Sequence, residues 1–254
     1  MTPTAGSTPA PGSAGSRYLA TLGTLISRLG TEEWPQIQAA ARAVAEALDH
    51  QRSVHVFGTG HSHLLAEELY YRAGGLVRVE PILFDGVMLH HSTQRSTALE
   101  RMPGLASALL ADHPIRNGDV LIVASNSGGN VATIEMARLG RQAGATVIAV
   151  TSMRHATSAA ARHSDLPRLH TLADIVLDNG GIPGDAAVDV PGFAKRIAPT
   201  STVIGAAIVN AVVAEAVQLL VERGRPPEVY ASLNTATGDA EHAASHPGIE
   251  PRTP

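Results

Sequence analysis

Five short apolar segments recur along the chain, separated by stretches of mixed character. Each is short, mostly apolar and rich in Val and Ile, as expected of strands buried on both faces of a parallel sheet. The predicted strands are residues 53–57, 76–84, 119–125, 145–150 and 173–178.

Helical spacing of apolar residues precedes the first strand and fills most of the gaps between strands. The predicted helices are residues 19–29, 37–50, 64–73, 104–111 and 132–142. Residues 200–223 are apolar on nearly every side, which predicts a buried helix. The alternation predicts an α/β fold: a three-layer, doubly wound, five-stranded parallel sheet in flavodoxin-like order, with two N-terminal helices.

The two ends of the chain differ in composition from the middle. Residues 1–16 are rich in Pro, Gly, Ser, Thr and Ala, which predicts a disordered tail without the apolar core of a secretory signal. Residues 243–254 are predicted to be a flexible tail. Residues 17–242 are then a single domain whose first helices form an N-terminal extension.

Composition narrows the class of protein. Hydrophobic residues make up 44% and charged residues 17% of the chain, which indicates a soluble globular protein. The formal charge of −4 without a basic block argues against nucleic acid as a partner. The absence of cysteine excludes disulfides and suits the cytoplasm. Apolar runs shorter than the ~20 residues of a membrane helix argue against a membrane span.

Polar loops follow the first and third predicted strands, and each opens directly into a helix. In a flavodoxin-like sheet these two strands end side by side, at the place where ligands bind. The loops read Gly-Thr-Gly-His-Ser at 58–62 and Ser-Asn-Ser-Gly-Gly-Asn at 125–130. Glycines let backbone N–H groups point outward, hydroxyls add donors, and the helix dipoles favour an anion. The pair predicts a phosphate cradle, although each loop taken alone fits an ordinary capped turn.

A dinucleotide site is the alternative interpretation of the first loop. Glu80 lies about 20 residues beyond the loop, where a ribose-binding acid is expected. His63, however, stands in place of the third glycine of that fingerprint. The second loop would also have no role, so phosphate handling is favoured.

These loops, together with Ala-Pro-Thr-Ser-Thr at 198–202 before the long apolar helix, resemble the sugar isomerase (SIS) superfamily. The resemblance runs from about Arg17 to His242. It is closest to an incompletely characterised subfamily of phosphosugar or phosphoheptose isomerase-like proteins, through "GHSHLLAEELYYRAGG", "ALERMPGLA" and "IEMA". It implies binding of a sugar phosphate at the carboxyl ends of the strands, and a homodimer or homotetramer whose subunits contribute to each other's sites.

The resemblance carries phosphate contacts to Ser125, Ser127 and Thr133, and implies that the loop at 200–202 completes the site. Together, the loop pattern and the resemblance predict these binding residues: Gly58, Thr59, Gly60, Ser62, Ser125, Asn126, Ser127, Asn130, Thr133, Thr200, Ser201 and Thr202. His61 replaces a lysine of the arabinose-phosphate isomerases, and Gly129 replaces an acid, so the activity of that group does not transfer directly.

Aldose–ketose isomerisation through an enediol needs a base beside the carbonyl and a group that manages the oxygens. Glu67 and Glu68 point about 100° apart on a helix, and Glu68 is favoured as the base because its position resembles that of a metal-ligand histidine in phosphoheptose isomerases. His61 is expected to assist, since an imidazole titrates near neutral pH. His242 is a third catalytic candidate, because some relatives send a histidine from this region into a neighbouring subunit's site.

Two questions stay open at the level of sequence. No cofactor is expected, but zinc held by His61 or His63 together with Glu68 is possible, because some phosphoheptose isomerases are reported to hold zinc. The favoured function is a sugar-phosphate isomerase acting on a phosphoheptose-type or amino-sugar phosphate. A sugar-phosphate lyase or etherase and a non-catalytic sugar-phosphate sensor are the alternatives.

Overall fold

The structure is a computed structural model that describes residues 12–158 and 166–232. Its centre is a five-stranded parallel sheet in the order β2-β1-β3-β4-β5, the flavodoxin-like order expected from the sequence. The strands are β1 (Val54–Gly58), β2 (Val79–Ile82), β3 (Val120–Ala124), β4 (Thr146–Thr151) and β5 (Ile175–Asp178). The predicted α/β fold is therefore confirmed.

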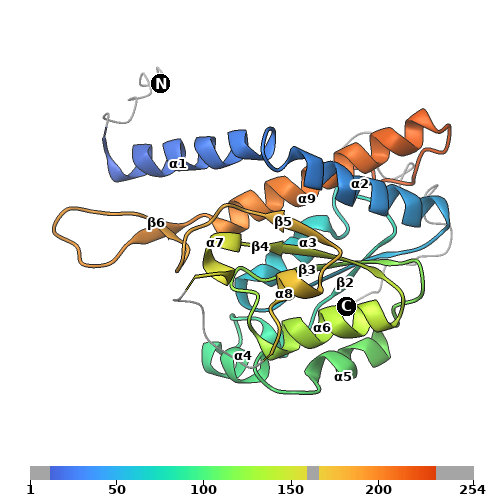
Figure 1. Ribbon diagram of the computed structural model, residues 1–254, viewed down its shortest axis with the longest axis horizontal. Helices are drawn as coiled ribbons and strands as arrows, with labels where there is room; N and C mark the ends of the chain where they lie inside the picture. Colours follow the sequence, from blue (N-terminus) through green and yellow to red (C-terminus); the bar gives the residue numbers. More distant parts are fainter. Residues whose placement is uncertain (1–11, 159–165, 233–254) are drawn as a thin grey trace, which may run out of the picture.

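Helices cover both faces of the sheet and give three layers (Figure 1). One face carries α2 (Trp34–Asp49), α3 (Leu64–Leu69) and α9 (Ser201–Glu222), with α1 (Ala14–Leu29) running alongside α9. The other face carries α5 (Leu105–Asp112), α6 (Val131–Gln142) and α8 (Leu169–Leu172). Shorter elements are the 3₁₀ turns η1 (Gly60–His63) and η2 (Asp85–Val87) and the helices α4 (Thr93–Leu99) and α7 (Met153–Ala156).

The apolar residues of the strands serve both layers. Val54 and Val56 of β1 pack into the core under α2 and α9, while Phe57 packs into the core under α5 and α6. Successive side chains of a strand point to opposite faces, so an unbroken apolar run is what a sheet covered on both sides requires. This arrangement leaves the carboxyl ends of the strands, and the loops that follow them, free for function.

Several boundaries differ from the sequence-based prediction, and those of α1 and α3 have a clear cause. Helix α1 begins at Ala14, inside the predicted tail, because the Ser13 hydroxyl accepts a hydrogen bond from the N–H of Ser16 and caps the helix. Helix α3 ends at Leu69 rather than at residue 73, since Tyr70 is extended and Tyr71 has a positive φ of 45°. The remainder of both tails and His242 lie outside the described residues.

The long connection after β5 contains a hairpin that the sequence analysis missed. Strands β6 (Ala186–Val188) and β7 (Ile197–Pro199) pair antiparallel and extend from the body of the molecule beside α1 (Figure 1). Arg17 and Tyr18 of α1 donate hydrogen bonds to the carbonyl oxygens of Asp189 and Pro199. The hairpin and the first helix are thus attached to each other.

Helix α9 is less buried than predicted. One side packs on α2 and α3, and Gly205 allows the close approach, because a Cβ there would lie 2.9 Å from a methyl group of Leu65. The opposite side is open, with Val203 43% and Val221 55% exposed. By length and mean hydropathy α9 alone, among the described helices, would pass for a membrane span, contrary to the sequence-based expectation. Here it packs against the sheet with 39% of its most apolar window buried.

Candidate functional site

The first predicted loop leaves β1 through a sharply constrained turn. A Cβ on Gly58 would lie 2.4 Å from the carbonyl oxygen of Ser62, so no other residue fits without moving the backbone. Gly60 has a positive φ of 56°, which favours glycine. The turn continues as η1 and brings the Ser62 hydroxyl and the exposed His61 ring to the carboxyl edge of the sheet.

Thr59 does a different job from the predicted one. Its hydroxyl donates a 2.9 Å hydrogen bond to the carboxylate of Glu100, the residue that ends α4. The carbonyl oxygen of Glu100 accepts from the N–H of Ala132, at 3.0 Å, in the first turn of α6. Glu100 therefore ties the two loops together, and its negative charge makes the Thr59 hydroxyl a poor phosphate ligand.

The second loop follows β3 and opens into α6. The Ser125 hydroxyl accepts a 3.1 Å hydrogen bond from the N–H of Gly128, whose positive φ of 61° bends the loop back on itself. Asn130 is the N-cap residue of α6 but makes no side-chain cap hydrogen bond. Such a loop, at the positive end of a helix dipole, suits an anion.

Thr133, in the first turn of α6, has a fully buried hydroxyl without a hydrogen-bond partner in the described structure. Buried hydroxyl groups nearly always have a partner. An unpaired one beside a predicted phosphate loop is consistent with a ligand that supplies the missing acceptor.

The third predicted segment, at the start of α9, is engaged by the chain itself. One carboxylate oxygen of Asp185 accepts from the N–H groups of Thr200 and Ser201, at 3.1 and 3.0 Å. The other oxygen accepts from the Ser201 hydroxyl at 2.5 Å. Asp185 therefore caps α9 from the start of the hairpin. The sequence analysis predicted that Thr200 and Ser201 bind phosphate, but in this structure these donors are bonded to Asp185.

The three segments nevertheless meet around one recess at the carboxyl ends of the strands. Its wall combines residues of both loops, α3, the ends of β4 and β5, and the start of α9: His61, Ser62, Leu65, Ala124, Ser125, Asn126, Val150, Asn179, Ser201 and Thr202. The recess has a volume of about 20 Å³, room for about one water molecule. The recess in this structure is therefore too small to enclose a phosphate group.

Of the predicted binding residues, Ser62, Ser125, Asn126, Ser201 and Thr202 line this recess, together with His61. Thr200 instead lines a neighbouring cavity of about 250 Å³ between α1 and the hairpin. The others do not line it. They lie in or beside the two loops, or in the first turn of α6: Gly58, Thr59, Gly60, Ser127, Asn130 and Thr133.

Asn179 is a site residue that the sequence analysis missed. It follows β5 directly, is buried, and donates a 3.0 Å hydrogen bond to the side-chain oxygen of Asn126. The carbonyl of Gly181 next to it accepts from the Ser152 hydroxyl at 2.6 Å. The sequence did show a polar residue directly after the fifth predicted strand. Only the fold, however, places that residue against the second loop.

An ion pair and a hydrogen bond fix the end of β5, directly before Asn179. Arg28 pairs with the Asp178 carboxylate at 2.8 Å, and Glu33 accepts a hydrogen bond from the Asp178 N–H at 2.9 Å. Burial raises the pKa of the Glu33 carboxyl above its ordinary value, against the lowering effect of that hydrogen bond and of Arg28. These contacts anchor the junction of α1 and α2 to the site.

The predicted base Glu68 does not line the recess in the described chain. Its carboxylate pairs with Arg72 and accepts a 2.7 Å hydrogen bond from the side chain of Asn210, on the side of α3 that faces α9. Glu67 pairs with His63, 3.2 Å away. His61 is thus the ionisable side chain that the described structure places in the recess.

The zinc alternative at the first loop lacks a converging ligand set. His63 is buried, with one ring nitrogen on the carbonyl oxygen of Gly60 and the other facing Glu67. Glu68 points toward α9, and the described residues hold no group of three ligand atoms formed by His61, His63 and Glu68. The described residues there do not fit a zinc ion.

The chain belongs to the SIS domain family, whose model matches residues 17–152. Relatives of similar sequence include UPF0309 proteins. The protein of Listeria monocytogenes serotype 4b is 40% identical over 220 residues, which cover 87% of this chain and 89% of the relative. The protein of Brucella canis is 44% identical over 218 residues, covering 86% and 88%.

Solved structures of similar fold include a phosphoheptose isomerase and the NanR protein. The phosphoheptose isomerase of Francisella tularensis superposes with a TM-score of 0.55 at 17% identity, covering 80% of this chain and 96% of that one. The Vibrio vulnificus NanR protein complexed with ManNAc-6P gives a TM-score of 0.50 at 17% identity, covering 84% and 66%. At this identity the likeness shows the fold alone.

Proposed function

We propose that this protein is a cytoplasmic sugar-phosphate isomerase that interconverts an aldose and a ketose phosphate through an enediol. The observation that carries the proposal is the recess itself. Two glycine- and hydroxyl-rich loops and the start of α9 surround it at the carboxyl ends of β1 and β3, where such a sheet binds ligands. Membership of the SIS family and the phosphoheptose isomerase of like fold support the substrate class.

In this proposal the phosphate sits against the second loop and the first turn of α6. Ser125 and Ser62 line the place, and the dipole of α6 supplies positive charge without a lysine. The unpaired Thr133 hydroxyl turns toward the phosphate when the loop adjusts. The amides of Asn126 and Asn179 remain at the wall to bind sugar hydroxyls.

His61 and Glu68 divide the proton chemistry in the proposal. His61 lines the recess and handles the sugar oxygens, because an imidazole both donates and accepts near neutral pH. Glu68 is the proposed base that moves the proton between the two carbons. From the side of α3 that faces α9 it reaches a substrate in one of two ways: Arg72 and Asn210 release it, or it serves the site of an adjoining subunit.

A second copy of this chain is the proposed partner. Helix α1 has a single buried residue and exposes Leu19 (61%) and Ile26 (49%), two turns apart on one side. The open side of α9 adds Val203 and Val221. Such an apolar face marks an interaction site, and we expect Leu19→Glu with Ile26→Glu to convert a dimer or tetramer into a smaller species in multi-angle light scattering.

A non-catalytic sensor is the second candidate, and one observation favours it. The described residues that line the recess include no carboxylate, which is what a binding site without a base would show. NanR, whose structure was solved with ManNAc-6P, shows that this fold also serves in a sugar-phosphate-binding protein that carries no isomerase name. A lyase or etherase would use the same proton abstraction and is separated by its product.

The test is proton NMR in D₂O with a pooled set of pentose, hexose, heptose and amino-sugar phosphates. An isomerase exchanges the proton beside the carbonyl and yields an aldose–ketose pair. Glu68→Gln should lower turnover by ~10² or more with little effect on binding, and Glu67→Gln is the matched control on the same helix. Binding without exchange supports the sensor, and a cleaved or unsaturated product supports the lyase. The absence of both binding and exchange would contradict the substrate class.

A further inference from the structure

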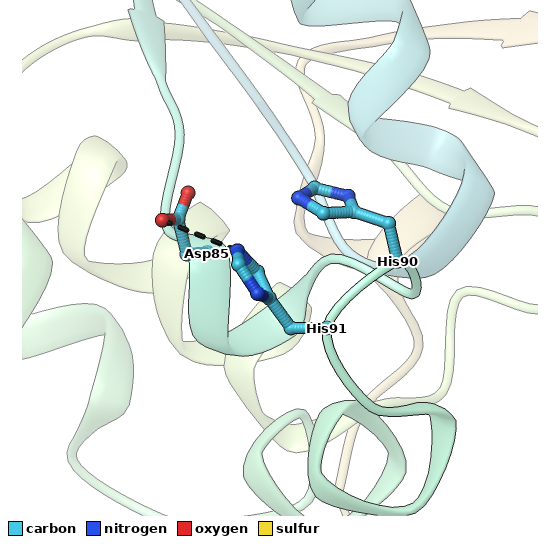
Figure 2. A group of neighbouring side chains, drawn as sticks. All are labelled: Asp85, His90 and His91. Atoms are coloured by element: carbon cyan, nitrogen blue, oxygen red, sulfur yellow. Dashed lines mark ion pairs between the residues drawn. The ribbon is translucent and has the colours of Figure 1, made fainter.

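One group of side chains outside the recess converges as metal ligands do. Asp85 lies at the start of η2, and His90 and His91 lie in the segment that leads to α4. Each offers one ligand atom, and the three atoms lie within 4.8 Å of one another. Figure 2 shows His91 facing the Asp85 carboxylate, with the His90 ring on the same side of the loop.

The spacing is close to that of a coordinated ion. Zinc bonds to nitrogen and oxygen are about 2.0–2.2 Å long, which puts ligand atoms of a tetrahedral site about 3.4 Å apart. The Nε2 of His91 and the nearer oxygen of Asp85 are 3.5 Å apart already, and the two imidazole centroids are 4.4 Å apart. All three side chains are exposed, so a rotation of His90 that closes the remaining gap meets little resistance.

The backbone between the proposed ligands is fixed by burial, a hydrogen bond and tight packing. Val87 and Met88, between Asp85 and the histidines, are buried in the protein. The Ser96 hydroxyl of α4 donates a 2.8 Å hydrogen bond to the carbonyl of Val87. Gly86 packs tightly, because a Cβ there would lie 2.8 Å from a methyl group of Leu99. Ligands on a fixed backbone lose less entropy when an ion binds.

We propose that Asp85, His90 and His91 bind a divalent transition-metal ion of the zinc class. Two imidazoles and one carboxylate are a donor set that zinc uses, with a fourth position left for water or another ligand. Magnesium and calcium are disfavoured, since they prefer oxygen ligands. None of the three ligands lines the phosphate recess, and His61 and His63 are not part of the group, so the proposal stands whether or not the protein is an isomerase.

Calorimetric titration of the metal-stripped full-length protein with zinc chloride tests this, followed by the visible spectrum of the cobalt-loaded protein. We expect one ion per chain and the intense absorption of tetrahedral cobalt. His91→Gln and Asp85→Asn should each weaken zinc binding at least about tenfold. His50→Gln is the matched control, because His50 is exposed and pairs with Glu46 alone.

Three results would overturn the proposal. The wild type could show no zinc binding at micromolar concentration. The variant that combines Asp85→Asn, His90→Gln and His91→Gln could bind zinc as tightly as the wild type. Binding could instead be lost in His61→Gln and kept in His91→Gln, which would move the ion to the phosphate loop. Since all three ligands are exposed, circular dichroism is expected to show that the variants fold as the wild type does.

Discussion

Replacing Gly58 by alanine is a sharp test of how the first loop is built. The new Cβ would lie 2.4 Å from the carbonyl oxygen of Ser62 and 2.9 Å from the N–H nitrogen of His63. An ordinary contact begins near 3.4 Å, so the backbone of η1 has to retreat by about 1 Å. Overpacking of this kind costs about 1–3 kcal/mol, and a backbone obstacle belongs at the upper end.

The lower flexibility of alanine in the unfolded chain returns about 0.4–1 kcal/mol. The expected net loss is therefore about 2 kcal/mol, measured by urea unfolding. Because Gly58 pairs with Ala124 at the start of the second loop, affinity for a sugar phosphate should also fall, about tenfold or more. Gly60→Ala is the control. Its Cβ meets no atom within 4 Å, and only its positive φ of 56° is strained.

We expect Gly60→Ala to lose about 1–2 kcal/mol of stability while keeping the recess and most of the affinity. A Gly58→Ala protein as stable as the wild type, with unchanged binding, would refute the account of the loop. So would a larger loss of affinity in Gly60→Ala than in Gly58→Ala.

Two further predictions concern the supports of the site. Burial raises the pKa of Glu33, so the stability it contributes is complete below its ordinary pKa of 4.5 and is lost as pH rises through the raised value. In chemical denaturation, Glu33→Gln should therefore gain stability over the wild type between pH 4 and 7, and a constant or falling difference would contradict this. Asp185→Ala removes the cap of α9 and should cost about 1–2 kcal/mol in thermal unfolding, whereas Asp185→Asn, which still accepts hydrogen bonds, should cost less. Equal losses in the two Asp185 variants would show that the cap is not what Asp185 contributes.

The sheet was predictable from the sequence because each strand is specified by residues that are neighbours in the sequence. Each predicted strand is a short Val- and Ile-rich segment, and the strands alternate with helices, which predicts a doubly wound parallel sheet like the observed one, of order β2-β1-β3-β4-β5. The loops after β1 and β3 were predictable for the same reason, since glycines and hydroxyls follow directly on those strands. The recess joins both loops with the start of α9.

Other features depend on contacts between residues far apart in the sequence. Asp185 caps a helix that starts 16 residues later, and the Thr59 hydroxyl donates its hydrogen bond to Glu100. Asn179 joins the recess only because β5 ends beside β4. The early end of α3 follows from the positive φ of Tyr71, a residue type that gives no such signal in the sequence.

The central claim is that the loops after β1 and β3 bind the phosphate group of a sugar phosphate. Its most direct test is to measure, by phosphorus NMR, the equilibrium binding of pooled sugar phosphates to the wild type and to Ser125→Ala. Ser158→Ala is a control outside the recess. Binding by the wild type and by Ser158→Ala, weakened about tenfold or more in Ser125→Ala because a hydroxyl that faces the anion is gone, is the predicted result. Equal binding by all three proteins, or no binding by any of them, would contradict the claim.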